Sequence, residues 1–535
     1  MLHIWRESSI HGVKYISDSK NNFIIRLFWF CSFSFSIICL FYYAKQAFIK
    51  FKVNPDINLI IRLRPIRDIP FPAVTICSPE PAENIFTSTD ITMEELHEFL
   101  LSFDEENLST EELGYLAAMA QACNSNYLSN IFQDRLEVLN LVKGRKNINN
   151  NIVKLLDEIS FPIRRIFMRC ESYHGYRYNC AQVMRRVITD QGFCFTYNLL
   201  DYDSIFNANV MSKDFDSYKG EIFSRLIFKN STNQTQWTLG SGYIENGNIP
   251  FRISNRHKFK VDMKFSFDAI YSCGAMNRNY KIIIHLPNEY PTEFHYYKFI
   301  ESNNANRIIM TAEYYENEPK LRKFSPESRD CYFEGERKLK FFKIYTKSQC
   351  NLECLTNHTL KTCNCVKFSM PREQNTPVCN LTQTICYEEA RSDWYDMNAE
   401  NRCKCLQPCT YIHYEVKDED RMSDGEARLE MSFDEFQIKS HENFVSYQLP
   451  NLIAELGGLL GLFMGCSLLS IIELFYFCFA SIAYVRNISK SSSNDQNILP
   501  THAMKLRVSE LQPKNSNLNN FQKEFNHKVH FSYHM

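Results

Sequence analysis

The sequence has no marked excess of charge of either sign, and it has little glycine. Its 60 Lys and Arg residues balance 61 Asp and Glu residues, which gives a net charge of −1 at pH 7. This balance provides neither the basic field that nucleic-acid binding requires nor an acidic solvating tail. Only 16 of the 535 residues are Gly, whereas 44% are hydrophobic. The chain therefore has ample core-forming material, and we expect neither nucleic-acid binding nor general disorder.

The common catalytic and nucleotide-binding signatures are also missing from the sequence. No H-E-x-x-H, G-x-S-x-G or G-x-x-x-x-G-K-[ST] motif occurs, and the 14 His residues are scattered. A lone His such as His285 is more simply explained as a strand or turn residue than as a ligand. We therefore expect no enzyme activity, no metal site and no bound cofactor.

Two long hydrophobic runs lie near the ends of the sequence. Residues 27–44 contain no charge, and residues 23–25 extend the run to the roughly 20 residues that cross a bilayer. No small-residue cleavage site follows, which favours an uncleaved span over a signal peptide. The second run, residues 452–485, includes Glu455 and Glu473. A carboxylate facing lipid costs about 3 kcal/mol, so these two groups are expected to face protein or water.

The segment between the two runs has the chemistry of an oxidising, extracellular compartment. It contains five N-x-S/T glycosylation sequons and 16 of the 20 Cys residues, an even number. The sequons are at Asn107, Asn230, Asn233, Asn357 and Asn380. The candidate disulfide cysteines are Cys77, Cys123, Cys170, Cys180, Cys194, Cys273, Cys331, Cys350, Cys354, Cys363, Cys365, Cys379, Cys386, Cys403, Cys405 and Cys409.

These features predict a two-span protein of the plasma membrane with both termini in the cytoplasm. Five segments follow along the chain: a cytoplasmic N-terminus (1–22), a first transmembrane helix (23–44), a cysteine-rich glycosylated ectodomain (45–450), a second transmembrane helix (451–485) and a disordered cytoplasmic tail (486–535).

The ectodomain is predicted to be mixed α/β. Helical spacing is expected over residues 91–142, and strands over residues 71–77, 281–287 and 429–433. If the strand that follows the first span pairs with the strand that precedes the second, one sheet would link both membrane helices.

Cysteines cluster between residues 331 and 409. Cys350 and Cys354 are four residues apart on one helical face, so a ladder of disulfides could pin that helix to the segment that follows. The pair Cys363 and Cys365 and the group Cys403, Cys405 and Cys409 could instead supply zinc ligands, but the oxidising compartment favours disulfides.

The second run combines small residues with acidic ones. Gly457, Gly458, Gly461 and Gly465 could serve ordinary helix packing. However, Glu455 lies about 15 Å before Gly465 along the helix axis, and Glu473 lies about 9 Å beyond Ser467. Acidic groups on both sides of a constriction of carbonyls and hydroxyls are typical of a cation pore. Two helices cannot enclose a water column, so the chain is expected to oligomerise around a cyclic axis.

At this point the chain resembles the degenerin and epithelial sodium channel family, most closely its insect pickpocket branch. The matching segments cover nearly the whole chain and occur in family order. They are SSIHGVKYI (8–16), FPAVTIC (71–77), TDQGFCFTYN (189–198), HLPNEYP (285–291), RDCYFEGERKLKFFKIYTKSQCNLEC (329–354), CNCVKFSMPR (363–372), CKCLQPC (403–409) and GGLLGLFMGCSLLSIIELFYF (457–477).

The resemblance implies a trimeric, amiloride-sensitive sodium channel with a hand-like ectodomain of palm, thumb, finger and knuckle. It implies Na⁺ as the permeant ion, related subunits as partners in a homo- or heterotrimer, and an extracellular ligand or other stimulus. By position, Gly465, Cys466 and Ser467 match the selectivity filter. Ala454 and Glu455 match the gate, Gly461 the amiloride region, and His11 and Gly12 the cytoplasmic gating motif. Glu473 is expected to be an inner acidic residue of the pore.

One alternative keeps the same topology. A two-span scavenger-type receptor would also have a glycosylated, cysteine-rich ectodomain that binds lipid or another ligand, without conductance. Such a receptor has no reason to place G-x-S between two acidic residues in its second span.

Overall fold

The chain divides into two units, Met1–Ala44 with Glu455–Met535, and Lys45–Ala454. The computed structural model describes residues 12, 15–16, 22–53, 56–78, 118, 121–122, 151–171, 177–215, 258–263, 279–301, 304–380, 383–396, 403–422, 427–465, 467, 469–470, 472, 475–476, 479 and 482.

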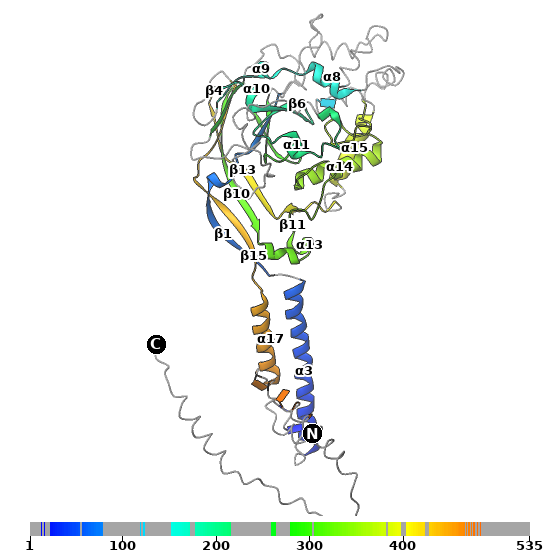
Figure 1. Cartoon of the computed structure of the whole chain (residues 1–535), viewed down its shortest axis with the longest axis vertical. Coiled ribbons are helices and arrows are strands. Elements are labelled where there is room, and N and C mark those ends of the chain that lie inside the picture. The colour runs from blue at the N-terminus through cyan, green and yellow to red at the C-terminus, as the bar shows by residue number, and fades with distance from the viewer. Residues whose placement is uncertain are drawn as a thin grey trace, which may run out of the picture. The chain divides into compact units, whose positions relative to one another are not determined.

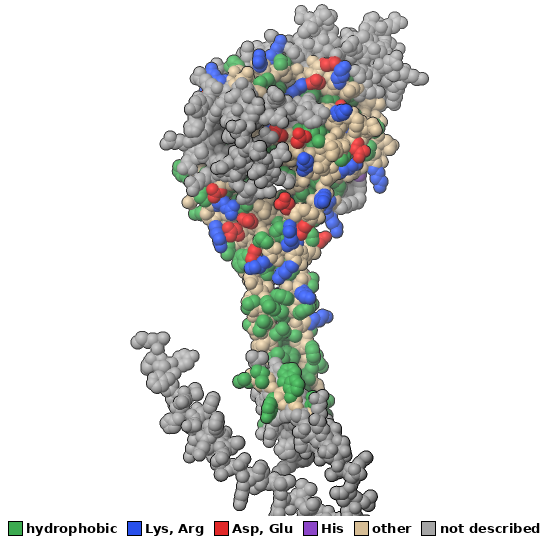
Figure 2. Space-filling view, in the orientation of Figure 1, with side chains coloured by type: hydrophobic (Ala, Val, Ile, Leu, Met, Phe, Trp, Pro, Cys, Tyr) green, Lys and Arg blue, Asp and Glu red, His purple; other side chains and the backbone are tan. Residues whose placement is uncertain are grey.

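The first unit is built on two apolar helices. Helix α3 (Phe23–Lys52) has a mean hydropathy of 2.0 over its most apolar window and is long and apolar enough to cross a membrane. Helix α17 (Leu449–Met464) is also apolar but has only 16 residues. Hydrophobic side chains cover the surface of both helices (Figure 2). The predicted first span is therefore present as a helix, whereas α17 covers only the start of the predicted second span, whose described residues from 469 onward are also helical.

The second unit contains a large sheet whose strands come from distant parts of the chain (Figure 1). The strand order is β1 (Ile57–Pro65), β15 (Gln437–Val445), β10 (Ala305–Asn317), β14 (Ala427–Phe433), β7 (Lys258–Met263), β3 (Phe167–Glu171) and β4 (Arg177–Tyr178). Strand β13 (Thr410–Met422) pairs antiparallel with β10 along nearly its whole length. On its other edge, β10 pairs with β15 through Glu313–Asn317 and with β14 through Ala305–Met310.

A five-stranded sheet packs against this large sheet. Its strand order is β5 (Met184–Thr189), β6 (Gly192–Tyr197), β2 (Ala73–Cys77), β8 (Tyr280–His285) and β9 (Tyr296–Ile300). Val74 and Ile76 on one face of β2 share a core with Met310 of β10 and Leu429 of β14. Because β2 is buried on both faces, its sequence reads as a continuous apolar run rather than an alternating one.

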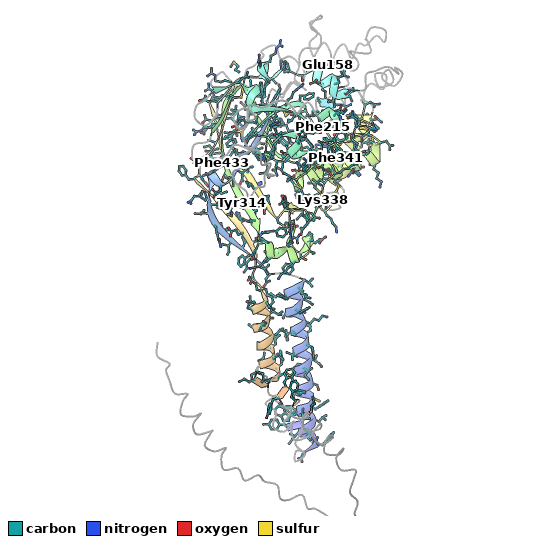
Figure 3. The ribbon with its side chains drawn as sticks, in the orientation of Figure 1. Glu158, Phe215, Tyr314, Lys338, Phe341 and Phe433 are labelled. Atoms are coloured by element: carbon teal, nitrogen blue, oxygen red, sulfur yellow. A yellow bond between two sulfur atoms is a disulfide. The ribbon has the colours of Figure 1, made fainter. Side chains whose placement is uncertain are left out.

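The opposite face of the five-stranded sheet is covered by helices. Ala73 and Ile283 share a second core with Leu355 of α14 (Lys347–Cys363) and Trp394 of α15 (Thr384–Asp396). Phe215 and Phe341 belong to the same core (Figure 3). Shorter elements complete the unit: η1 (Ile66–Asp68), α8 (Ile152–Ile159), α9 (Ile163–Ile166), α10 (Cys180–Val183), α11 (Tyr202–Ile205), η3 (Pro319–Lys323), α13 (Pro326–Arg329), β11 (Cys331–Tyr332) and β12 (Gln407–Pro408).

Fourteen of the predicted cysteines form seven disulfides. The pairs are Cys77–Cys194, Cys170–Cys180, Cys331–Cys409, Cys350–Cys405, Cys354–Cys403, Cys363–Cys386 and Cys365–Cys379. The predicted ladder on α14 is confirmed, because Cys350 and Cys354 bridge to Cys405 and Cys403. The zinc alternative is wrong, since its candidate thiolates are consumed in disulfides. Cys123 and Cys273 lie outside the described residues.

The predicted pairing of the strand at 71–77 with the strand at 429–433 is wrong. Residues 71–77 contain β2 of the five-stranded sheet, and residues 429–433 lie in β14 of the large sheet, so these two strands do not pair with each other. Instead β1, which follows α3, pairs with β15, which precedes α17. The strand predicted over 281–287 is β8. Of the helical region predicted over 91–142, only 118, 121 and 122 are described, and these are helical.

Two of the five sequons fall on described residues. Asn357 is exposed on α14 and is accessible to a glycan. Asn380 is half-buried in the loop before α15, where its side-chain oxygen accepts a hydrogen bond from the Gln383 backbone N–H at 3.0 Å. The other three, Asn107, Asn230 and Asn233, lie outside the described residues.

Candidate functional site

The small residues of α17 lie on one face of that helix. Ala454, Gly457, Gly458 and Gly461 fall within about 100° around the helix axis, and all four are exposed. At each of the three glycines, a built Cβ atom meets no described atom within 4 Å. In the single chain this face is therefore open.

The opposite side of α17 contacts α3. Phe463 lies about 200° around the helix from Gly461. Its ring stacks on Tyr43 of α3, with 6.0 Å between ring centroids and an interplanar angle of 12°. The glycine face consequently points away from this aromatic contact, so small-residue packing against the chain's own α3 does not account for it.

Helix α17 is interrupted at the predicted filter. It ends at Met464, and Gly465 adopts φ = +62°, a left-handed conformation that favours glycine. The Gly465 N–H donates to the Gly461 carbonyl at 3.0 Å and closes the last turn. The remaining carbonyls of a last helical turn have no intrahelical donor, so they are available to water or a cation.

Ser467 begins the next helical stretch. Its hydroxyl accepts a hydrogen bond from the Ser470 N–H at 3.2 Å, the geometry of a helix N-cap. Residues 469 and 470 are helical. The G-x-S segment is thus a break between two helical pieces, with Ser467 exposed. Cys466 between them and Glu473 beyond them lie outside the described residues, and Glu455 is exposed on the second turn of α17.

Gly12 forms a tight turn before α3. It has φ = +85°, and its carbonyl accepts hydrogen bonds from the N–H groups of Tyr15 and Ile16, both at 3.2 Å. The Tyr15 ring stacks on Trp29 of α3, with centroids 4.7 Å apart. This turn therefore rests on α3, while its partner in the predicted gating motif, His11, lies outside the described residues.

Strand β1 follows α3 and strand β15 precedes α17, so their pairing connects the two helices. The sequence analysis did not identify this pairing. Nine residue pairs run in antiparallel register from Ile57 with Val445 to Pro65 with Gln437. The ladder is extended toward the helices by a hydrogen bond from the Ser446 N–H to the Asp56 carbonyl at 2.8 Å. Because both strands are bonded along their length, displacement of β1 must displace β15. The alternating apolar residues of INLIIRLRP were a usable signal for this strand.

An ion pair joins β1 to the central strand β10 of the large sheet. The Arg64 guanidinium lies 3.2 Å from the Glu316 carboxylate of β10 and 4.1 Å above the Tyr314 ring. Arg62 pairs with Glu442 of β15 at 3.3 Å. Motion of the large sheet is therefore coupled to the strands next to both helices.

A buried polar network joins the five-stranded sheet to the start of α14, and sequence reasoning also missed it. His285 lies on β8 as predicted, and its Nε2 is 2.8 Å from the Thr75 hydroxyl. The Glu289 carboxylate contacts His295 Nε2 at 3.2 Å and accepts from the Ser348 hydroxyl at 2.9 Å.

Burial determines the protonation of this network. Desolvation, with a contribution from His295, lowers the pKa of His285 to about 3, so that ring is neutral. Burial alone would raise the pKa of Glu289, but the charge of His295 and the hydrogen bonds from His295 and Ser348 lower it to about 2. Glu289 is therefore a charged group buried inside the unit Lys45–Ala454.

Known proteins match this chain over most of its length. The family described as amiloride-sensitive sodium channel matches residues 5–477. Pickpocket protein 28 of Drosophila melanogaster is 21% identical over 519 residues, covering 89% of this chain and 78% of the relative. Sodium channel protein Nach of Drosophila ananassae is 21% identical over 505 residues, covering 88% and 84%. Acid-sensing ion channel 1C of Danio rerio is 20% identical over 547 residues, covering 93% and 88%.

The family match spans both apolar helices and the disulfide-rich unit between them. It is a family of ion channels and not of enzymes, in agreement with the lack of catalytic motifs. The receptor alternative is not favoured, because none of these three relatives is named as a receptor of that kind. The chain belongs to the amiloride-sensitive sodium channel family.

Proposed function

We propose that this chain is a subunit of an amiloride-sensitive channel that passes Na⁺ across the plasma membrane. The observation that carries the proposal is the open glycine face of α17, which leads to a helix break at Gly465 and Ser467. Membership of the amiloride-sensitive sodium channel family indicates that the permeant ion is Na⁺. In this proposal Gly465, Cys466 and Ser467 form the selectivity filter, with backbone carbonyls and the Ser467 hydroxyl replacing water around Na⁺.

The channel is a trimer of this chain or of this chain with related subunits. Each subunit contributes two membrane spans, residues 23–44 and residues 451–485, with residues 45–450 outside the cell as a hand-like ectodomain. The termini, residues 1–22 and 486–535, are cytoplasmic. The open glycine face supports this arrangement, because a face that avoids its own α3 is free to meet the pore or a neighbouring subunit.

The gate lies at Ala454 and Glu455, on the outer side of the filter. Gly461 belongs to the amiloride-contact region one turn above the filter, and Glu473 is an acidic residue on its inner side. His11 and Gly12 act on the gate from the cytoplasm. An extracellular ligand or another stimulus shifts the large sheet, and the paired strands β1 and β15 transmit that shift to both helices.

Whole-cell recording of an Ala454→Phe variant tests the proposal. A bulky side chain at the gate should prevent closure, so we expect a standing inward current that disappears when external Na⁺ is replaced by a large organic cation and is blocked by amiloride. Leu459→Phe, about 140° around the helix from Ala454 and on the side away from the glycine face, is the matched control and should pass no standing current. Surface-labelled Ala454→Phe protein that passes no current, alone or with related subunits, would contradict the assignment.

A further inference from the structure

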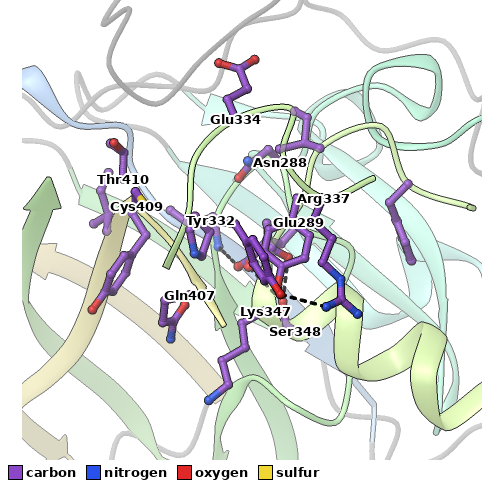
Figure 4. Close-up of a pocket in the computed structure, with 18 of the residues that line it drawn as sticks. Asn288, Glu289, Tyr332, Glu334, Arg337, Lys347, Ser348, Gln407, Cys409 and Thr410 are labelled. Atoms are coloured by element: carbon purple, nitrogen blue, oxygen red, sulfur yellow. Dashed lines mark hydrogen bonds between the residues drawn. The ribbon is translucent and has the colours of Figure 1, made fainter. Parts of the chain in front are cut away.

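The ectodomain contains a cavity that no part of the proposed pore uses. Its volume is about 1200 Å³, enough for a small organic molecule. One wall is formed by β10 and β13 of the large sheet, and the other by residues 332–348, which lead into α14 (Figure 4). Tyr314 on the first wall and Lys338 on the second are labelled in Figure 3.

The lining of the cavity carries a surplus of positive charge. The guanidinium of Arg337 donates to the backbone carbonyls of Cys403 at 2.7 Å and Lys404 at 2.8 Å, and to the Tyr332 hydroxyl at 3.1 Å. These partners are neutral, so they orient the guanidinium without cancelling its charge. The five cationic side chains of the lining are Arg322, Arg337, Lys338, Lys343 and Lys347. Arg322 lies 4.0 Å from Glu336, which is outside the lining, so the surplus comes from the other four.

Two of the three acidic side chains of the lining are already neutralised. Glu289 accepts hydrogen bonds from Ser348 and the Leu286 N–H and contacts His295. Glu316 is paired with Arg64. The third, Glu334, is exposed at the surface. The cavity therefore favours a ligand with negative charge.

Aromatic rings supply an apolar surface beside these charges. Tyr332 and Tyr345 meet edge to face, with centroids 5.2 Å apart and an interplanar angle of 77°. Trp394 packs against Phe294 with centroids 5.3 Å apart, and all four residues line the cavity. Rings arranged in this way accept a further ring by edge or face contact.

Two buried polar atoms of the lining lack partners among the described residues. The Asn288 side chain is 4% exposed, and its Oδ1 accepts no hydrogen bond there. Trp394 is 2% exposed, and its Nε1–H donates none there. Buried polar groups are normally satisfied, so an acceptor and a donor left over in one cavity indicate a ligand with complementary groups.

We propose that this cavity binds a small organic anion whose body is a ring and which carries a hydrogen-bond donor. Arg337, Lys338 and Lys347 attract the anionic group, the tyrosine rings contact the body, and Asn288 Oδ1 accepts from the donor. The site lies wholly within the ectodomain, and its occupancy does not depend on the pore assignment.

Calorimetric titration of the purified full-length protein with 4-hydroxybenzoate tests this proposal. The uncharged methyl ester of 4-hydroxybenzoate has the same ring and donor, and benzoate has the same ring and charge without the donor. We expect 4-hydroxybenzoate to bind at least five-fold more tightly than either. The proposal would be overturned if 4-hydroxybenzoate gave no heat of binding at concentrations up to about 10 mM. Equal affinity for the neutral ester would also overturn it.

Lysine-to-glutamine variants distinguish a loss of charge in the cavity from a loss of folded structure. The double variant Lys338→Gln, Lys347→Gln should weaken 4-hydroxybenzoate binding at least five-fold and leave the ester unchanged. Lys340→Gln is the matched control, because Lys340 is on the same segment but pairs with Glu373 at 2.6 Å and does not line the cavity. It should bind as the unaltered protein does. Equal weakening by Lys340→Gln and by the double variant would show a nonspecific charge effect and would refute the site.

Asn288→Leu tests the donor contact. This change removes the acceptor, so 4-hydroxybenzoate and benzoate should then bind with equal affinity. A preference for 4-hydroxybenzoate that survives in Asn288→Leu would contradict the assignment of Asn288. Because each of these readouts is binding, they remain valid whether or not the chain conducts Na⁺.

Discussion

The two disulfides of the ladder on α14 should stabilise the unit Lys45–Ala454 in a strongly non-additive way. Cys350–Cys405 and Cys354–Cys403 close nested loops, with sequence separations of 55 and 49 residues. When one rung is intact, the other closes only the short loop of the few residues between the rungs. Loop-closure entropy then gives about 2 kcal/mol for loss of either rung, but about 6 kcal/mol for loss of both.

The assay is the thermal unfolding midpoint of the purified full-length protein, with both cysteines of a rung replaced by Ser. Each single-rung variant should lower the midpoint slightly, and the variant without both rungs should lower it about three times as much. As a control, loss of Cys354–Cys403 should combine additively with loss of Cys170–Cys180, because those two loops share no residues. Simple additivity within the ladder would refute the reasoning.

Three further predictions concern charge, pH and backbone conformation. Arg372 is 2% exposed, contacts Asp214 at 2.5 Å and donates to the Phe368 carbonyl at 2.7 Å, so Arg372→Met should leave that buried carbonyl and the half-buried Asp214 carboxylate without their donor and destabilise the unit Lys45–Ala454 by about 1 to 3 kcal/mol in the same thermal assay. Since the pKa of His285 is about 3 in the folded chain and about 6.5 when unfolded, stability should be full above pH 6.5 and fall by about 1.4 kcal/mol for each pH unit below it, and His285→Gln should flatten this dependence between pH 6.5 and 5. Gly465→Ala forces a side chain into φ = +62°, so surface-labelled protein should carry an altered ratio of Na⁺ to K⁺ permeability, and an unchanged ratio would argue against Gly465 in the filter.

Much of the candidate pore could be predicted from sequence because its signals are local. Gly465 and Ser467 were expected to form a distinct segment, and the helix ends immediately before Gly465. A hydrophobic span and the spacing of its glycines can both be read from one continuous segment, so predicting them does not require knowledge of distant contacts. The ladder on α14 was predictable for the same reason, since Cys350 and Cys354 are one helical turn apart.

The strand pairing was harder because it depends on contacts across several hundred residues. Residues 71–77 have a strong strand pattern because β2 is buried on both faces. For this reason they were predicted to be the strand that follows the first span and pairs with the strand before the second. The strand that links the helices, β1, is an edge strand with exposed Leu59, Ile61 and Leu63, so its pattern is weaker. The cavity and the Glu289 network were likewise inaccessible, because their residues come from β8, β10, β13 and α14 and meet only in the fold.

Cysteine accessibility tests most directly whether the glycine face of α17 lines the ion pathway. Gly461→Cys and Leu462→Cys differ by about 100° around the helix, and each would be made together with Cys466→Ser. All of these chains also carry Ala454→Phe, and the Ala454→Phe, Cys466→Ser chain is the reference. The charged thiol reagent MTSET is applied outside the cell, and the current recorded is the inward current that disappears when external Na⁺ is replaced by a large organic cation. The account predicts rapid loss of current for Gly461→Cys and no change for Leu462→Cys. Equal responses, or loss of current for Leu462→Cys alone, would contradict a pore formed by the glycine face.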